Sequence, residues 1–294
     1  MVKTITTINL MTLDKKFIPL DKSWIIRMGI LDVTRGQNQI LEFLASQVNL
    51  GYDLLALQRA AKVWRTNDPI DVGESGTLFR LLQFASWKLG LNKQFIKHGT
   101  LPTRKITDNP EIINWPQEKL LELDNNTSQW ASAAVLLGDK QRMKNPPYKL
   151  QLTYDAIAHW EEKKSQGKAW EPKYDQTIFN QAQSFLELLQ GKKPKFIPEQ
   201  AEDYCFARVF EYITKEQGEK LWPSLKGHES NRIEEMENVI LAAHQGQPIS
   251  SADHRAVEAI ALWGILNHKQ VIIIKPEAVN KSWPQFWEFL ETVK

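Results

Sequence analysis

The chain has 294 residues, with 37 Lys and Arg against 35 Asp and Glu and a single cysteine, Cys205. This length predicts two domains, and a net charge of +2 argues against a protein that bulk charge holds on nucleic acid or on a membrane surface. One cysteine allows neither an internal disulfide nor a cysteine metal cluster, and the longest apolar runs are too short to span a bilayer, so we expect a cytoplasmic protein.

Short β-prone runs alternate with helical patterns along the chain. The runs are KTITTINL at 3–10, KQFIKHG at 93–99, YKLQLT at 148–153, PKFIP at 194–198 and KQVIIIKP at 269–276. Helical patterns of about 12 to 18 residues separate them, which is typical of an α/β protein. We therefore predict an α/β fold in which a strand, a polar turn and a capped helix recur about six times.

The starts of the predicted helices are well marked. One helix is predicted to begin at Thr77 and to stop at Gly90, and Thr127 and Ser128 precede a second that ends at Gly138. Two further starts fit the capping box, in which a side chain three residues on reaches back to the cap: Ser250 with Asp253, and Ser282 with Gln285.

Polar and basic residues gather at these starts, where unpaired N–H groups and the helix dipole favour anions. They are Lys22, Ser23, Arg27, Gly76, Thr77, Arg80, Thr127, Ser128, Gln129, Glu229, Arg232, His254, Arg255 and Lys281. The turn GESGT at 73–77 matches neither a Walker loop nor a dinucleotide fingerprint. Each residue taken singly is usually a helix cap or a solvated side chain, so only the whole set predicts an anion site.

In their order along the chain, these segments resemble the enolpyruvyl transferase family from Lys22 to Lys281. The matching motifs are DKSWIIR at 21–27, GESGT at 73–77, TSQW at 127–130, PPY at 146–148, GHESNR at 227–232, DHR at 253–255 and NKSWPQF at 280–286. Each is short, but independent short matches rarely fall in sequence across a whole chain.

The resemblance implies transfer of the enolpyruvyl group of phosphoenolpyruvate to a hydroxyl of shikimate 3-phosphate, a step of aromatic amino acid biosynthesis. Small phosphorylated molecules would be its only partners, and no cofactor, metal, nucleic acid, membrane or second subunit is expected. Lysine and arginine suit such substrates, because they neutralise phosphate and carboxylate and arginine grips both through two bonds.

The resemblance also implies roles for individual residues. Those expected to hold the shikimate 3-phosphate acceptor are Lys22, Ser23, Arg27, Thr127, Ser128, Gln129 and Tyr148. Those expected to hold phosphoenolpyruvate are Gly76, Thr77, Arg104, Arg232, Arg255 and Lys281. Glu229 matches one of two proton-transferring carboxylates. For the other, Glu199, Glu202 and Asp203 remain open; we choose Asp203 for its position and spacing, although an acidic helix cap would look the same.

Three substitutions depart from the family pattern. His228 stands in place of a catalytic lysine and can replace its charge only when protonated. Glu74 replaces an asparagine, and Asp21 enters the lysine-serine loop, so both put a carboxylate close to the expected anion. Either these side chains point away from the site or the ligand differs from the usual one.

Family members have two domains of repeated βαβαββ units, with helix N-termini directed at a cleft between the domains. We expect one middle domain at 21–165 and a second, discontinuous domain from 1–20 and 166–294. One of the two is expected to be reduced, because a repeat unit is replaced between Tyr148 and Asp203.

Overall fold

The computed structural model describes residues 13–138, 146–166, 173–226 and 231–293. These residues are mostly helical. Their only sheet is a parallel pair, β1 (Ile70–Asp71) and β2 (Phe95–Ile96), in which Ile70 lies opposite Phe95. Isolated bridges join Leu20 to Tyr174 and Ile249 to Ile273.

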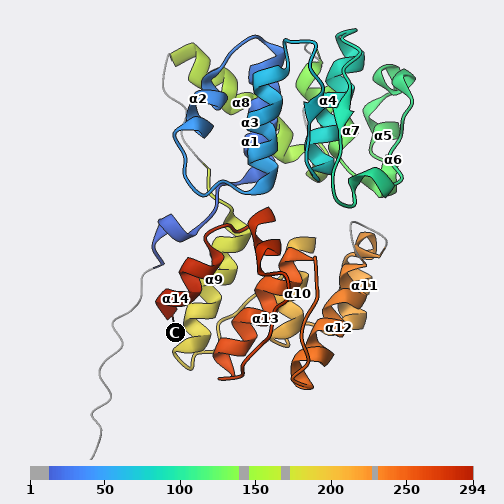
Figure 1. The fold of residues 1–294 in the computed structure, drawn as a ribbon. Helices are drawn as coiled ribbons and strands as arrows, with labels where there is room; N and C mark the ends of the chain where they lie inside the picture. The colour runs from blue at the N-terminus through green and yellow to red at the C-terminus, as the bar shows by residue number, and fades with distance from the viewer. Residues whose placement is uncertain (1–12, 139–145, 167–172, 227–230, 294) are drawn as a thin grey trace, which may run out of the picture.

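The helices form two bodies, one above the other in Figure 1. The first body holds α1 (Lys22–Thr34), α2 (Gln39–Ala45), α3 (Tyr52–Val63), α4 (Gly76–Lys88), α5 (Gln117–Leu120), α6 (Leu123–Asn126), α7 (Gln129–Leu137) and α8 (Tyr148–Gln166). One continuous apolar cluster, which runs from Trp24 to Trp160, fills it. Trp130 is fully buried there and stacks on Trp87, with ring centroids 5.8 Å apart.

The second body holds α9 (Gln176–Leu189), α10 (Tyr204–Val209), α11 (Lys215–Leu221), α12 (Arg232–His244), α13 (His254–Leu266) and α14 (Phe286–Val293). Two apolar clusters fill it, and Ile18 from the N-terminal segment joins the one around Phe185 and Phe286. Nearly every residue of α13 is buried, as expected for a helix at the centre of a core.

Two chain segments connect the bodies and run side by side. The backbone N–H of Asp21 donates to the Lys173 carbonyl at 2.8 Å, and the N–H of Asp175 donates to the Pro19 carbonyl at 2.9 Å. Each segment leads directly into a helix, because Asp21 caps α1 and Asp175 caps α9 through their carboxylates. The helices α1 and α9 therefore start from one place, next to the contact between the bodies.

Most of the segments predicted as strands do not form strands in the structure. Residues 148–153 open α8 instead, because Leu150, Thr153 and Ile157 recur at helical spacing and bury one face. Residues 194–198 form no strand, 269–276 contribute one bridge, and 93–99 contribute the two residues of β2. The run at 3–10 lies outside the described residues. A mostly helical chain is compatible with a reduced family domain, but the repeated βαβαββ units are not confirmed.

The predicted helix starts agree with the structure to within a few residues. Ser75 caps α4, one residue before the helix begins, and α7 begins directly after Ser128. The predicted capping box at Ser250 is wrong, because Asp253 caps α13 and accepts from the backbone N–H groups of Arg255 and Ala256. The Ser282 prediction is displaced in the same way, since α14 begins at Phe286.

Candidate active site

Helix N-termini from both bodies meet where the bodies touch. The start of α3 contacts the second body through Tyr52, whose hydroxyl accepts from the Asn280 amide at 3.2 Å. The Gln285 amide donates to the Asn49 carbonyl, also at 3.2 Å. These bonds bring the segment that precedes α14 against the loop that precedes α3.

Four positive charges act on a buried histidine in this region. The imidazole of His254, at the first position of α13, is 6% exposed. Burial lowers its pKa well below the usual value, and the charges of Lys22, Arg255, Arg232 and Lys281 lower it further. Lys22 belongs to the first body and the other three residues to the second. These four residues, called the positive cluster below, therefore come from both bodies.

Two arginines of this cluster are held by carboxylates of the second body. The Arg232 Nε donates to Asp253 Oδ2 at 2.9 Å, while the other oxygen of Asp253 caps α13. Arg255 is 4% exposed and lies 3.4 Å from Glu258 and 3.9 Å from Asp175. Its Nε is buried and has no acceptor among the described residues. An additional anion would satisfy this donor.

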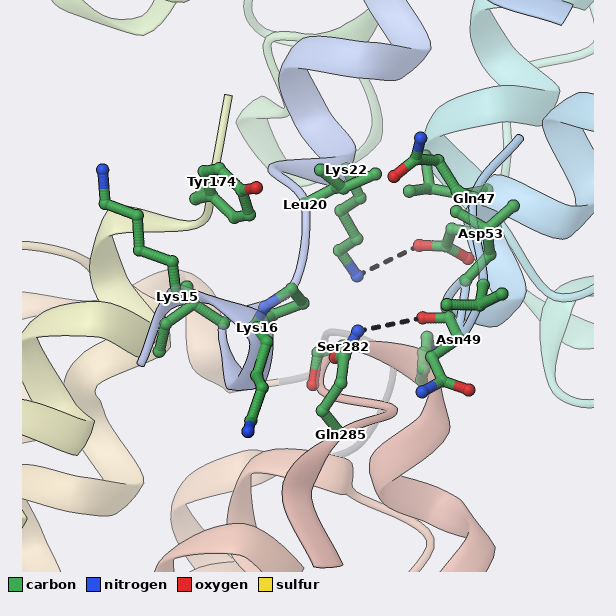
Figure 2. Close-up of a pocket in the computed structure, with 17 residues that line it drawn as sticks. Lys15, Lys16, Leu20, Lys22, Gln47, Asn49, Asp53, Tyr174, Ser282 and Gln285 are labelled. Atoms are coloured by element: carbon green, nitrogen blue, oxygen red, sulfur yellow. Dashed lines mark hydrogen bonds and ion pairs between the residues drawn. The ribbon is translucent and has the colours of Figure 1, made fainter. Parts of the chain in front are cut away.

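Lys22 lies at the edge of a pocket of about 210 Å³ between the bodies. Its ammonium group is 3.0 Å from the carboxylate of Asp53 at the start of α3. Lys281 and Gln285 line the same pocket from the second body. Figure 2 shows Lys22, Asp53 and Asn49 on one side, Gln285 directed toward them, and Lys15 and Lys16 extending away from the centre.

A second polar group joins the N-termini of α4 and α7 in the first body. Gln129 donates to the Thr77 hydroxyl at 2.7 Å and accepts from Arg80 at 2.8 Å. Arg80 is buried and also donates to Asp124 at 2.7 Å. Asp124 in turn accepts from Trp130. Thr77 and Gln129 are thus brought together, and Arg80 is fixed in place by its partners.

Arg104 and Glu74 connect this group to the positive cluster. The Arg104 guanidinium lies 3.4 Å from Glu74, and a Cβ built on Gly76 would lie 3.0 Å from Arg104 Nη1. Burial opposes ionisation of Glu74, but hydrogen bonds from Thr100 and the charges of Lys281 and Arg104 leave its pKa below the usual value. Glu74 is therefore an ionised carboxylate beside two residues expected to bind phosphoenolpyruvate.

The remaining predicted acceptor residues lie in different surroundings. Arg27 turns inward and donates to Thr153, to Ser132 and to the Ser23 carbonyl; burial lowers its pKa to about 10. The Tyr148 side chain is 82% exposed. Thr127 and Ser128 are half-buried at the start of α7. The structure thus brings Lys22 to the positive cluster and leaves Arg27 outside it.

The predicted proton-transferring residues are only partly visible. His228 and Glu229 lie outside the described residues. Asp203 is buried, and its carboxylate accepts from Gln181 and from the backbone N–H groups of Glu199 and Gln200. Asp203 thus caps a turn, as in the alternative interpretation of this residue as an acidic cap. Its catalytic role stays a prediction. Glu202 is exposed, and its charge acts on both Arg232 and Arg255.

Sequence reasoning missed three carboxylates of the site: Asp53, Asp175 and Glu258. Asp53 and Asp175 follow helix-start patterns that are common on any surface, so their sequence signal is weak. Glu258 carried a clear signal, because it is the one acidic residue in the apolar stretch HRAVEAIALWGIL at 254–266. It is 3% exposed, and burial raises its pKa to about 7.

One comparison with known proteins finds a family model that matches part of this region. Residues 228–290 match the family model described as EPSP synthase (3-phosphoshikimate 1-carboxyvinyltransferase). This part of the chain is EPSP-synthase-like. The match spans about a fifth of the chain and contains Arg232, the triplet at 253–255 and Lys281. The resemblance to EPSP synthases that the motifs predict is confirmed over this segment. No curated protein and no solved structure matches the chain.

The structure adds two findings on alternative classes of site. No helix in the described part of the chain is long and apolar enough to cross a bilayer. Within the same residues, no group of three or more His, Cys, Asp or Glu side chains is placed to hold a metal ion.

Glu258 should give the protein a measurable pH dependence of stability. Its pKa of about 7 in the folded protein lies above the usual 4.5, so its contribution is fully present below pH 4.5 and is lost as the pH rises to about 7. His254 acts in the opposite sense, because its lowered pKa stabilises the fold above pH 6.5. Urea unfolding of the protein and of Glu258→Gln between pH 5 and 8 isolates the first effect. The variant is expected to gain stability relative to the parent as the pH rises, and a constant difference would contradict the assignment.

Proposed function

We propose that the chain is an enolpyruvyl transferase that transfers the enolpyruvyl group of phosphoenolpyruvate to a hydroxyl of 3-phosphoshikimate and releases phosphate. The observation that carries the proposal is the positive cluster around His254, to which both bodies contribute. Substrates with two phosphates and two carboxylates between them need such a cluster, and the family match covers three of its four cations.

The expected chemistry assigns a task to each part of the site. The acceptor hydroxyl attacks C2 of phosphoenolpyruvate and loses its proton, while C3 gains a proton, which gives a tetrahedral adduct. Loss of a proton from the same carbon then expels phosphate and restores the double bond. Arg232, Arg255 and Lys281 would hold the phosphate and carboxylate of phosphoenolpyruvate, with Arg104 opposite them on the first body. Lys22, the cation that the first body contributes to the positive cluster, would hold the acceptor.

Two observations support Glu202 over Asp203 as the carboxylate that faces the substrates. One Asp203 oxygen accepts from Gln181 and the other from backbone N–H groups of the turn that it caps, whereas the exposed Glu202 carboxylate acts on Arg232 and Arg255. A proton-transferring carboxylate has to reach the bound substrates, which a buried cap does not do. Glu229 and His228 keep their proposed catalytic roles from the family pattern.

The division into a middle domain at 21–165 and a domain from 1–20 and 166–294 is also part of the proposal. The separate apolar clusters of the two bodies support it, and so does the position of Ile18, which packs in the second body. Closure of such domains would exclude water and strengthen each charge contact. We infer a monomer acting in the cytoplasm on small phosphorylated substrates.

A phosphate-release assay tests the proposal. The protein is expected to release phosphate from phosphoenolpyruvate only when shikimate 3-phosphate is present, and Glu202→Gln is expected to reduce kcat by about 100-fold or more, the usual range for a general acid or base. Glu199→Gln is the matched control, since Glu199 is exposed nearby and only its backbone N–H contacts Asp203. Release that does not depend on the acceptor would contradict the proposal.

A transferase for another acceptor, or a binding protein without turnover, is the second candidate. Arg27 is turned inward by hydrogen bonds to Thr153, Ser132 and the Ser23 carbonyl, and Arg104 already has the Glu74 carboxylate beside it. The first observation removes a cation expected to hold the acceptor, and the second offsets the charge of one expected to hold phosphoenolpyruvate. Phosphoenolpyruvate that binds in calorimetry without any turnover on shikimate 3-phosphate would favour this candidate.

A further inference from the structure

Glu258 is a buried carboxylate that joins two parts of the candidate site. It lies in the middle of α13, where its Oε1 accepts from the Ser282 hydroxyl at 2.6 Å and its Oε2 lies 3.4 Å from Arg255 Nη1. Ser282 directly follows Lys281 at the end of the 3₁₀ turn Pro276–Lys281. One side chain therefore contacts an arginine and the turn that carries a lysine, both of which are proposed to bind anions.

The groups around Glu258 act on its charge in opposite directions. Arg255 and the Ser282 hydroxyl favour the ionised form, whereas burial and the carboxylates of Asp175 and Asp253 favour the protonated form. The Glu258 charge also acts on the buried thiol of Cys205, on α10. Burial is the largest of the effects on Glu258 and raises its pKa to about 7, so near neutral pH a change in nearby charge moves the proton.

We propose that Glu258 is a positioning residue that holds Arg255 and the Lys281–Ser282 turn in place, and that it takes up a proton when an anion binds to Arg255. This inference rests on the proposed function only in requiring an anion site at Arg255. Without ligand, the ionised Glu258 balances part of the cationic charge. A bound dianion neutralises the same cations and repels the Glu258 carboxylate. Protonation of Glu258 removes this repulsion.

Calorimetry with sulfate measures this coupling directly. Sulfate is a dianion that does not titrate near pH 7, whereas phosphate monoesters have a second pKa of about 6 and would add protons of their own. Binding at pH 7 is measured in two buffers of different ionisation enthalpy, which gives the number of protons taken up. The parent is expected to take up as much as about half a proton per sulfate, because Glu258 is about half ionised at that pH.

Three variants assign the proton to Glu258. Glu258→Gln is expected to bind sulfate with proton uptake close to zero, since the amide cannot titrate. Glu237→Gln is the matched control, because the Glu237 carboxylate on α12 pairs with Arg208 on α10. Proton uptake by this variant should be unchanged. Ser282→Ala removes a hydrogen bond to the ionised form, so maximal uptake is expected to shift to higher pH.

The outcomes separate this inference from the proposed function. Sulfate that binds with no proton uptake, or with uptake that persists in Glu258→Gln, overturns the coupling and leaves the anion site standing. Sulfate that does not bind the parent overturns both. Thermal unfolding of each variant at pH 7 shows that the protein is folded, and Glu258→Met provides a second carboxylate-free variant if the glutamine fails to fold.

Discussion

Arg255→Gln is expected to weaken phosphoenolpyruvate binding by about 10- to 100-fold, because a charge-assisted hydrogen bond contributes about 1.5–3 kcal/mol. Arg255 is buried beside the other cations, and its Nε has no acceptor among the described residues. Glutamine keeps much of the length of the side chain and removes its charge. Calorimetry with phosphoenolpyruvate at constant ionic strength measures the change.

The control for this experiment is Arg208→Gln. Arg208 forms a two-bond pair with Glu237, at 2.8 and 2.9 Å, between α10 and α12. The Arg208→Gln variant loses the same charge from the same body, so its affinity for phosphoenolpyruvate should stay within about twofold of that of the parent. Equal affinities for Arg255→Gln and the parent would show that Arg255 does not face the ligand.

A large loss of stability is expected for Arg80→Met. Arg80 and Asp124 form an ion pair whose side chains are 8% and 5% exposed, and removal of one partner from such a pair costs about 3–5 kcal/mol. Asp124 would keep its bonds from Thr107 and Trp130 but lose the cation that lowers its pKa. Urea unfolding at pH 7 measures the change in the free energy of unfolding.

An exposed arginine of the same body provides the comparison. Arg59 pairs with Asp71, but these side chains are 47% and 34% exposed, so Arg59→Met should change stability by less than about 1 kcal/mol. Similar losses for the two variants would mean that the Arg80 network adds nothing beyond a surface ion pair. The lowered pKa of Asp124 adds a second signature: its stabilising effect is present above the usual pKa of 3.8 and is lost as the pH falls below it.

Part of the candidate site was readable from the sequence because its residues stand at helix starts. Caps and turn glycines are local signals, and they correctly located the starts of α4 and α7. The order of short motifs then indicated which starts belong to one site, and the family match at 228–290 confirms the resemblance for the last of them. Local pattern and colinear order together were enough to bring Lys22, Arg232, Arg255 and Lys281 into one prediction.

The rest of the fold and of the candidate site could not be predicted from the sequence, because it depends on how the helices pack. Apolar and polar residues alternate along 148–153 as in a strand, but these residues form the first turns of α8 and pack against the apolar cluster of the first body. Arg27 stands one turn into α1, as a ligand-binding arginine would, yet Thr153 and Ser132 on neighbouring helices turn it inward. Asp203 and Glu202 are adjacent in sequence, and only the fold separates a buried cap from an exposed carboxylate.

The paired connections between the bodies limit how the two halves can move. Hydrogen bonds tie Asp21 to Lys173 and Pro19 to Asp175, so a rotation about the long axis of the molecule would break both, whereas bending across them would keep both. Lys22 lies directly after one connection and close to that bending axis. Its ammonium group would thus move little if the two bodies opened by bending at these connections.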